Sequence, residues 1–312
     1  MKLIKRIPIP FCGVALGLAA AGNLLQSTFP VLRPVFGIAS AVVLVLFLLK
    51  LILFFPAVRE DLKNPVQASV SGTFCMACML LSVYIKPLVS IAGEVLWFAA
   101  VVLNILLILY FSIRFMKKMK PAEYHASFYI VYVGIATASI SAPAWNMQLI
   151  GKVIAVFALV AFLLMVIPVT WRYLKGGPVP PAAKPLFVVS AAPASLCIVA
   201  IKNAFGASWA IPMILLFILG TVLYVPAVIL AIRKAFTTFF PSFAAFTFPL
   251  VISAIATTVI RSLLGGMEQT SGMAVLGHVI GGWGIFQQIA AVFMTVRVLI
   301  RFLVSFGQTK EL

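Results

Sequence analysis

Side chains able to carry out chemistry are scarce in this chain of 312 residues, which has six acidic residues, two histidines and four cysteines. Cys75 and Cys78 form a CxxC pair, a spacing that in a soluble protein suits redox chemistry or metal binding. No further Cys or His lies near them in the sequence, so we interpret them as small packing residues on one helix face. No Ser-His-Asp order, HExxH motif or glycine-rich phosphate loop occurs. The sequence therefore predicts neither a metal site nor a cofactor.

A proline at an unusual place suggests another kind of chemistry, ion binding by backbone groups. No Lys, Arg, Asp or Glu occurs between Ala235 and Ile260, and Pro249 follows Thr247 and Phe248 near the middle of that stretch. Proline inside a helix removes a backbone donor and clashes with the preceding turn. At membrane depth such a break is tolerated where the freed groups face protein or a water-filled cavity. We therefore expect a helix break at Pro249, with the Phe248 ring at the same level.

Similar breaks are expected in the other segments that share this composition. Pro193 interrupts one of them, Gly13 and Gly17 loosen another, and Gly72 and Gly134 loosen two more. Kinked helices can direct amide dipoles at an anion without a fixed charge, so that the anion binds weakly enough to leave. A purely structural kink is the alternative.

The composition shows which elements must position these residues. The chain is 64% hydrophobic and 9% charged, with a mean hydropathy of +1.20, whereas soluble proteins carry about 25% charged residues. We predict an all-α integral membrane protein forming a single transmembrane domain over residues 1–312. The predicted spans are ten: 8–28, 35–58, 65–85, 92–114, 126–147, 151–173, 185–204, 208–232, 240–263 and 274–302.

The distribution of basic residues predicts the orientation. With the N-terminus inside, 18 of the 23 Lys and Arg lie on the cytoplasmic side. The five left outside are Arg33, Lys86, Lys152, Lys202 and Arg261. We expect an inner-membrane protein with both termini in the cytoplasm. The net charge of +17 is scattered between apolar runs, which argues against nucleic acid as a partner. The basic loop 114–120 favours membrane lipids with acidic headgroups instead.

A repeat organises the spans. Prolines precede the odd-numbered spans at Pro8, Pro65, Pro121, Pro185 and Pro241, which are 57, 56, 64 and 56 residues apart. This period indicates one helical hairpin used five times. Odd spans are rich in small and hydroxyl residues and even spans in bulky ones, so we predict an inner ring of odd helices around a central pore. A packed helical core without a pore is the alternative.

The predicted inner ring contains almost no ionisable side chain, and Glu94 lies at the outer start of the fourth span. Proton-coupled carriers usually bury acidic residues or histidines on their route. A pore without acidic groups below a basic surface favours inorganic or small organic anions. Two alternatives remain: a proton-coupled carrier of dicarboxylates such as malate, or of oxyanions such as tellurite and sulfite, and a membrane enzyme.

Four of the five predicted inner helices carry a family resemblance, in the segments 7–23, 125–139, 184–198 and 243–256. "TFP" and "APAS" are their most specific elements. The sequence resembles the tellurite-resistance/dicarboxylate transporter family, which includes the bacterial TehA proteins and the plant slow anion channels. The resemblance implies five quasi-symmetric hairpins around a central pore, a homotrimer, and transport of anions such as chloride, nitrate, sulfite or malate.

The resemblance also implies roles for single residues. Phe248 matches the ring that occludes the family's pore, and Gly13 matches a glycine that packs near that ring. Phe128 and Phe187 are weaker predictions for the pore lining, to which Thr247 and Ile252 are added.

Overall fold

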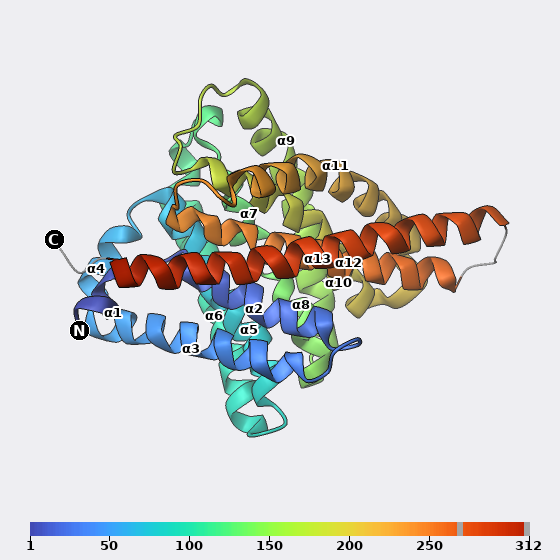
Figure 1. Ribbon diagram of the computed structural model, residues 1–312, viewed down its shortest axis with the longest axis horizontal. Helices are drawn as coiled ribbons and strands as arrows, with labels where there is room; N and C mark the ends of the chain where they lie inside the picture. The colour runs from blue at the N-terminus through green and yellow to red at the C-terminus, as the bar shows by residue number, and fades with distance from the viewer. Residues whose placement is uncertain (267–270, 309–312) are drawn as a thin grey trace.

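The computed structural model describes residues 1–266 and 271–308, and these residues form helices and no strands (Figure 1). The α-helices are α1 (Lys2–Arg6), α2 (Phe11–Leu25), α3 (Leu32–Leu53), α4 (Phe55–Asp61), α5 (Pro65–Ile85), α6 (Ser90–Arg114), α7 (Phe128–Tyr132), α8 (Ala136–Ser141), α9 (Gln148–Lys175), α10 (Ala192–Phe205), α11 (Ala210–Lys234), α12 (Phe248–Gly265) and α13 (Ser271–Gln308). The 3-10 helices are η1 (Met116–Lys118), η2 (Pro121–Glu123), η3 (Ala142–Trp145), η4 (Lys184–Ala191), η5 (Gly206–Trp209) and η6 (Pro241–Phe246). The predicted all-α class is confirmed.

Each predicted span falls on helical residues, but not each on one long helix. Seven helical stretches of the described residues are long and apolar enough to cross a membrane, and one of these, Lys184–Lys234, contains two predicted spans. The first predicted span is the shorter apolar helix α2, with 15 residues. The fifth is divided into α7, α8 and η3. The number of ten membrane crossings therefore stays a prediction.

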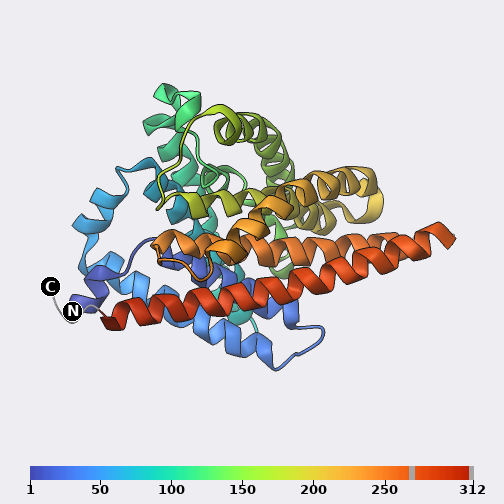
Figure 2. The same ribbon diagram turned by 45° about the horizontal axis from the view of Figure 1, so that its top comes forward.

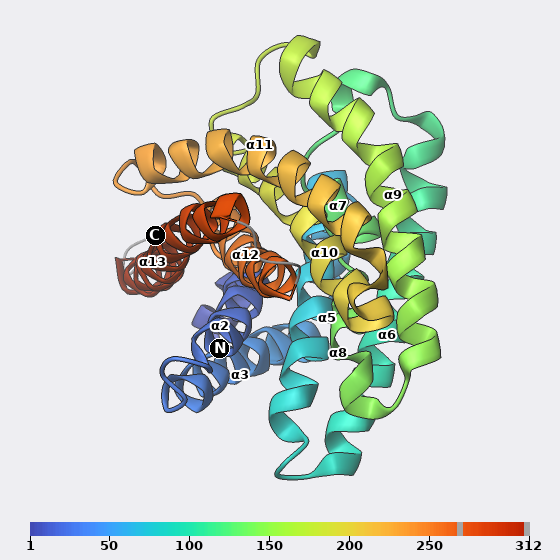
Figure 3. The same cartoon turned by 90° about the vertical axis from the view of Figure 1, so that its right-hand side faces the viewer.

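Consecutive helices pack as pairs, and the first helix of each pair belongs to a closed inner ring. The pairs in contact are α2 with α3, α5 with α6, α8 with α9, α10 with α11, and α12 with α13. The first members of the pairs also contact one another in a circle, α2 with α5, α5 with α8, α8 with α10, α10 with α12, and α12 with α2. Viewed end-on, the second members lie outside this ring (Figure 3).

Burial distinguishes the two layers as the composition predicted. Only Asn23 and Leu25 of α2 are not fully buried. In Pro241–Gly265, 83% of the most apolar window, a stretch of 18 residues, is buried. The corresponding windows of α6 and α9 are only 28% buried. Small residues in the inner layer let backbones approach closely, and bulky residues cover the outside, where a bilayer would accept them.

The inner ring is interrupted where its 3-10 segments become α-helix. Pro193 lies in the first turn of α10 directly after η4, and Pro249 lies in the first turn of α12 directly after η6. Proline is well tolerated there, because the first helical N–H groups have no intrahelical acceptor. Thr247, between η6 and α12, has φ −92° and ψ −91°, outside the helical range. Pro249 thus starts a helix rather than kinking one at its middle.

Helices α2 and α13 meet at one end of the molecule. The Phe11 ring, at the start of α2, lies 4.8 Å from the Phe302 ring and 5.3 Å from the Phe306 ring of α13. Helix α13 runs across the front of the molecule in Figure 1 and along its lower side in Figure 2, and its last turns lie near α1 in both views. The described ends of the chain are therefore on the same side.

Candidate functional site

A central cavity of about 40 Å³ lies inside the inner ring. Its wall is formed by Pro10, Gly13, Leu16, Val70, Thr73, Met76, Tyr129, Ile130, Leu186, Val189, Ala192, Pro193, Leu196, Ser242, Ala244, Ala245, Phe248 and Pro249. These residues come from α2 and the segment before it, from α5, from α7, from η4 and α10, and from η6 and α12. Helix α7, rather than the ring member α8 that follows it, supplies the third part of the wall. A single water needs a cavity of roughly 10–15 Å³, so the space has room for only a few water molecules.

Phe248 forms part of this wall at the junction between η6 and α12. It is the first residue of α12 and is 5% exposed. Ala244 and Ala245 of η6 and Pro249 of α12 flank it in the wall. Because small residues surround it, the ring is the largest apolar group that this segment brings to the cavity.

Two glycines of α2 allow this segment to approach closely. A Cβ on Gly13 would lie 3.2 Å from Cβ of Ala244, and a Cβ on Gly17 would lie 2.5 Å from Cβ of Thr247. The latter distance is shorter than any real Cβ contact, so a side chain at position 17 requires a shift of the backbone. Both glycines lie inside unbroken α-helix. Their contribution is close approach rather than a break in α2.

Gly72 and Gly134 allow a similar close approach where α5 packs against α7 and the turn that follows it. A Cβ on Gly72 would lie 3.1 Å from Cγ2 of Ile130, and one on Gly134 would lie 2.2 Å from the carbonyl oxygen of Ile130 and 2.7 Å from Sδ of Met76. Gly72 lies in the continuous helix α5, whereas Gly134 lies in the turn between α7 and α8. Ile130 and Met76 both line the cavity, so these glycines bring its wall together.

Four predicted pore-lining residues are absent from the described wall of this cavity. Phe128 packs against the ring of Phe111 in α6 at 5.0 Å, and Phe187 packs against Tyr173 in α9 at 4.9 Å. Thr247 and Ile252 are buried behind the wall, with 0% and 3% exposure. The cavity instead brings together Gly13, Pro193, Phe248 and Pro249 of the predicted set.

On a common α-helix Phe246 would face away from Phe248, because two residues span about 200° of the helix. It packs against the ring of Phe243 at 4.8 Å and is not part of the described cavity wall. The two phenylalanines lie in different elements, η6 and α12, so a single helical period does not relate them.

Sequence reasoning missed most of the wall, including Leu16, Met76, Tyr129 and Leu196. The signal was available as a spacing of three, as in Pro10, Gly13 and Leu16. Positions three apart lie on one helix face, so extending that face from Gly13 would have found Leu16.

The cavity is neutral, and two helix N-termini reach it. Within the described residues, no charged side chain lines its wall. The acidic residues that the structure describes lie elsewhere, Glu60 and Asp61 on α4, Glu94 on α6 and Glu123 on η2. The first residues of α10 and of α12 are in the wall. A helix N-terminus carries partial positive charge, so this environment favours an anion over a cation.

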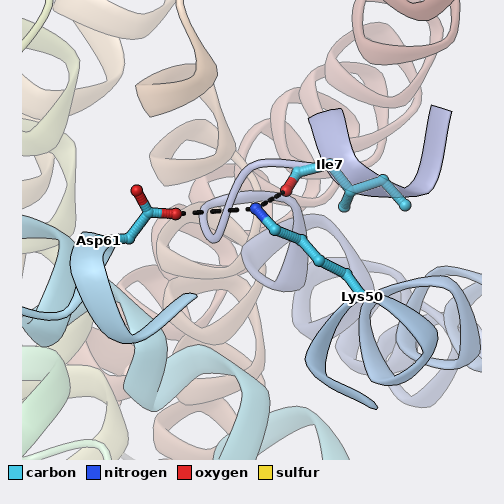
Figure 4. A network of polar contacts seen from close by, with 3 residues as sticks. All are labelled: Ile7, Lys50 and Asp61. Atoms are coloured by element: carbon cyan, nitrogen blue, oxygen red, sulfur yellow. Dashed lines mark hydrogen bonds and ion pairs between the residues drawn. The ribbon is translucent and has the colours of Figure 1, made fainter. Parts of the chain in front are cut away.

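A buried lysine fixes the entry of the chain into the ring. Nζ of Lys50, which is 4% exposed, donates a 2.6 Å hydrogen bond to the carbonyl oxygen of Ile7 and lies 3.7 Å from Oδ2 of Asp61 (Figure 4). The ammonium group therefore joins α3, α4 and the segment before α2. Pro10, three residues after Ile7, is already part of the cavity wall.

Comparison with known proteins gives one clear result. Residues 6–309 match the family described as voltage-dependent anion channel, SLAC1. A search of curated proteins gave no match. The match covers nearly the whole chain, including every residue of the central cavity. This multi-pass membrane protein therefore belongs to the SLAC1 family of voltage-dependent anion channels, within the tellurite-resistance/dicarboxylate transporters, and is an anion channel or transporter.

Proposed function

We propose that the protein is a channel for small inorganic or organic anions, whose central pore is closed by the Phe248 ring. The observation that carries the proposal is the position of Phe248 in a central cavity walled by residues of α2, α5, α7, η4 and α10, and η6 and α12. An anion crossing the ring along its axis has to pass this residue. The side chain of Phe248 is therefore assigned the role of a gate, which must move before an anion can pass.

The surroundings of Phe248 support an anion as the permeating species. The wall is uncharged, so selectivity falls to the dipoles of α10 and α12 rather than to fixed charges. Binding without a fixed counter-charge is weak enough to allow release, which a conducting pore requires. The Gly13 and Gly17 positions keep α2 close to the gate segment.

A flux assay in liposomes tests the proposal and separates it from a proton-coupled carrier. We expect Phe248→Ala to raise chloride and nitrate efflux at least about tenfold, equivalent to ~1.4 kcal/mol of barrier, without a pH gradient. Phe246→Ala is the matched control, since it removes a buried ring of the preceding element that is not in the described wall. Flux that saturates and requires a pH gradient would favour the carrier of malate or of oxyanions.

We also propose an inner-membrane location with cytoplasmic termini, and a homotrimer as the family resemblance implies. The four cysteines are all buried, so an introduced surface cysteine is the main target for a membrane-impermeant maleimide. Lys5→Cys should react from the cytoplasmic side only and Lys152→Cys from the opposite side only. Native mass measurement tests the trimer.

A further inference from the structure

A second cavity lies between α10, α11, α12 and α13, behind the inner ring. Its volume is about 10 Å³, near the lower limit for one water molecule. The polar residues in its wall are Ser195, Thr221, Tyr224, Ser253, Thr257 and Gln287. Such a density of hydroxyl and amide groups between packed helices contrasts with the apolar wall of the central cavity.

One of these groups is a donor without an acceptor. Tyr224 is 1% exposed, and its hydroxyl is buried with no hydrogen-bond partner among the described residues. Buried polar groups in folded proteins are almost always hydrogen-bonded, to protein or to an ordered water. The Thr221 hydroxyl donates to the carbonyl oxygen of Phe217 at 2.8 Å, and no hydrogen bond joins it to the Tyr224 hydroxyl.

Another group is an acceptor without a donor. Oγ of Ser195 can donate its single proton to the carbonyl oxygen of Ala191 or to Oγ of Ser253, both at 3.3 Å. No described residue donates a hydrogen bond to it in return, although a hydroxyl oxygen accepts up to two. An unused donor and unused lone pairs thus line the same cavity.

We propose that this cavity binds one water molecule, which accepts the proton of the Tyr224 hydroxyl and donates to Oγ of Ser195. A water supplies both an acceptor and donors, and buried waters typically make about three hydrogen bonds. Oε1 of Gln287, which accepts from the Thr257 hydroxyl, lines the cavity and is available for the second water proton.

The water site would strengthen the contact that joins the two junctions of the ring. Oγ of Ser253 lies 3.1 Å from the carbonyl oxygen of Ala191, the last residue of η4, and 2.8 Å from that of Pro249 in α12. Ser253 therefore connects the two places where 3-10 helix becomes α-helix. Through Ser195, the water links this connection to Tyr224 of the outer helix α11.

The sign of a stability change tests the proposal. With the water bound, Tyr224→Phe removes a satisfied hydrogen bond, so the Tm should fall. Without it, the same change removes an unpaired buried hydroxyl, so the Tm should stay or rise. Tyr84→Phe sets the scale, because the Tyr84 hydroxyl donates to the carbonyl oxygen of Ala19 at 2.6 Å. We expect the Tm to fall by a similar amount in both variants. An unchanged or raised Tm for Tyr224→Phe overturns the water site.

A density map of the wild-type protein gives a second, independent test. At a resolution near 2 Å we expect a peak about 2.7–2.8 Å from both Oη of Tyr224 and Oγ of Ser195, the usual O–H···O distance. A featureless cavity in such a map contradicts the proposal. Neither test involves transport, so the water site and the anion channel succeed or fail separately.

Discussion

The hydroxyl of Thr247 donates a hydrogen bond to the carbonyl oxygen of Gly13 at 2.9 Å, joining residues 234 positions apart in the chain. It closes the inner ring between its first and last members, directly before Phe248. Thr247 is fully buried, and Gly17 one turn further along α2 leaves room for its side chain. The position of the proposed gate therefore depends on small residues of α2.

Gly17→Ala should disturb this contact. Its Cβ would lie 2.5 Å from Cβ of Thr247, so we expect α2 and the gate segment to separate, at about 1–3 kcal/mol of stability. Gly282→Ala is the control, since nothing lies within 4 Å of a Cβ there. Thermal unfolding in detergent compares the two. Equal Tm values for both variants would show that the close approach at Gly17 is unimportant.

Lys50→Met should destabilise the entry into the ring. Methionine keeps most of the side-chain volume but removes the donor to the carbonyl oxygen of Ile7, and a buried acceptor left unpaired costs about 1–3 kcal/mol. Lys63→Met is the control, because Lys63 pairs with Glu60 at the surface and its side chain is 60% exposed. Exposed pairs contribute roughly 0–1 kcal/mol. Unfolding in detergent should therefore show a larger loss for Lys50→Met; a larger loss for Lys63→Met contradicts this.

His125 should make the protein sensitive to mild acid. It lies outside the helices, between η2 and α7, and burial followed by the nearby charge of Arg172 lowers its pKa. The unfolded chain has a histidine pKa of about 6.5. The folded state thus resists protonation, so stability is complete above that value and falls as the pH drops below it.

Replacing the histidine tests this pH dependence. His125→Gln should reduce the loss of Tm between pH 7.5 and pH 5.5. His278→Gln, which changes the exposed second histidine in α13, should leave that loss as in the wild type. If the loss of Tm at the lower pH persists in His125→Gln, groups other than His125 cause it.

Replacing each of the two phenylalanines at the junction with alanine should destabilise the protein to different extents. Phe246 is 0% exposed and packs in an aromatic cluster with Phe243, so Phe246→Ala should show the full core penalty of about 3–5 kcal/mol. Phe248 borders a cavity and is 5% exposed, so Phe248→Ala should cost less. Unfolding of both variants under one condition measures the difference. The reverse order would place Phe248 in the packed core.

Much of the architecture could be predicted from the sequence, because long apolar runs and the contrast between small and bulky segments report directly on membrane burial. Hydropathy alone did not show that the span at 126–147 is divided, since a short helix and a long one have the same composition, but Gly134 was expected to loosen this span and lies in the turn between α7 and α8. Nor did it show that Pro249 starts α12, because proline is compatible with both a kink and a first turn.

The residues in the wall of the central cavity were harder to predict than the helices. Phe128 and Phe187 came from the family resemblance, without a helix face, and neither lies in the described wall of the central cavity. Phe187 lies in η4, where the neighbours Leu186 and Val189 line the cavity instead. A face is predictable only where the helix type is known.

Voltage-clamp current in chloride and nitrate, with surface expression checked, tests the gate most directly. The account predicts large anion currents for Phe248→Ala and little current for the wild type and for Phe246→Ala. A well-expressed Phe248→Ala that carries no anion current would contradict the assignment of Phe248 as the gate of an anion channel.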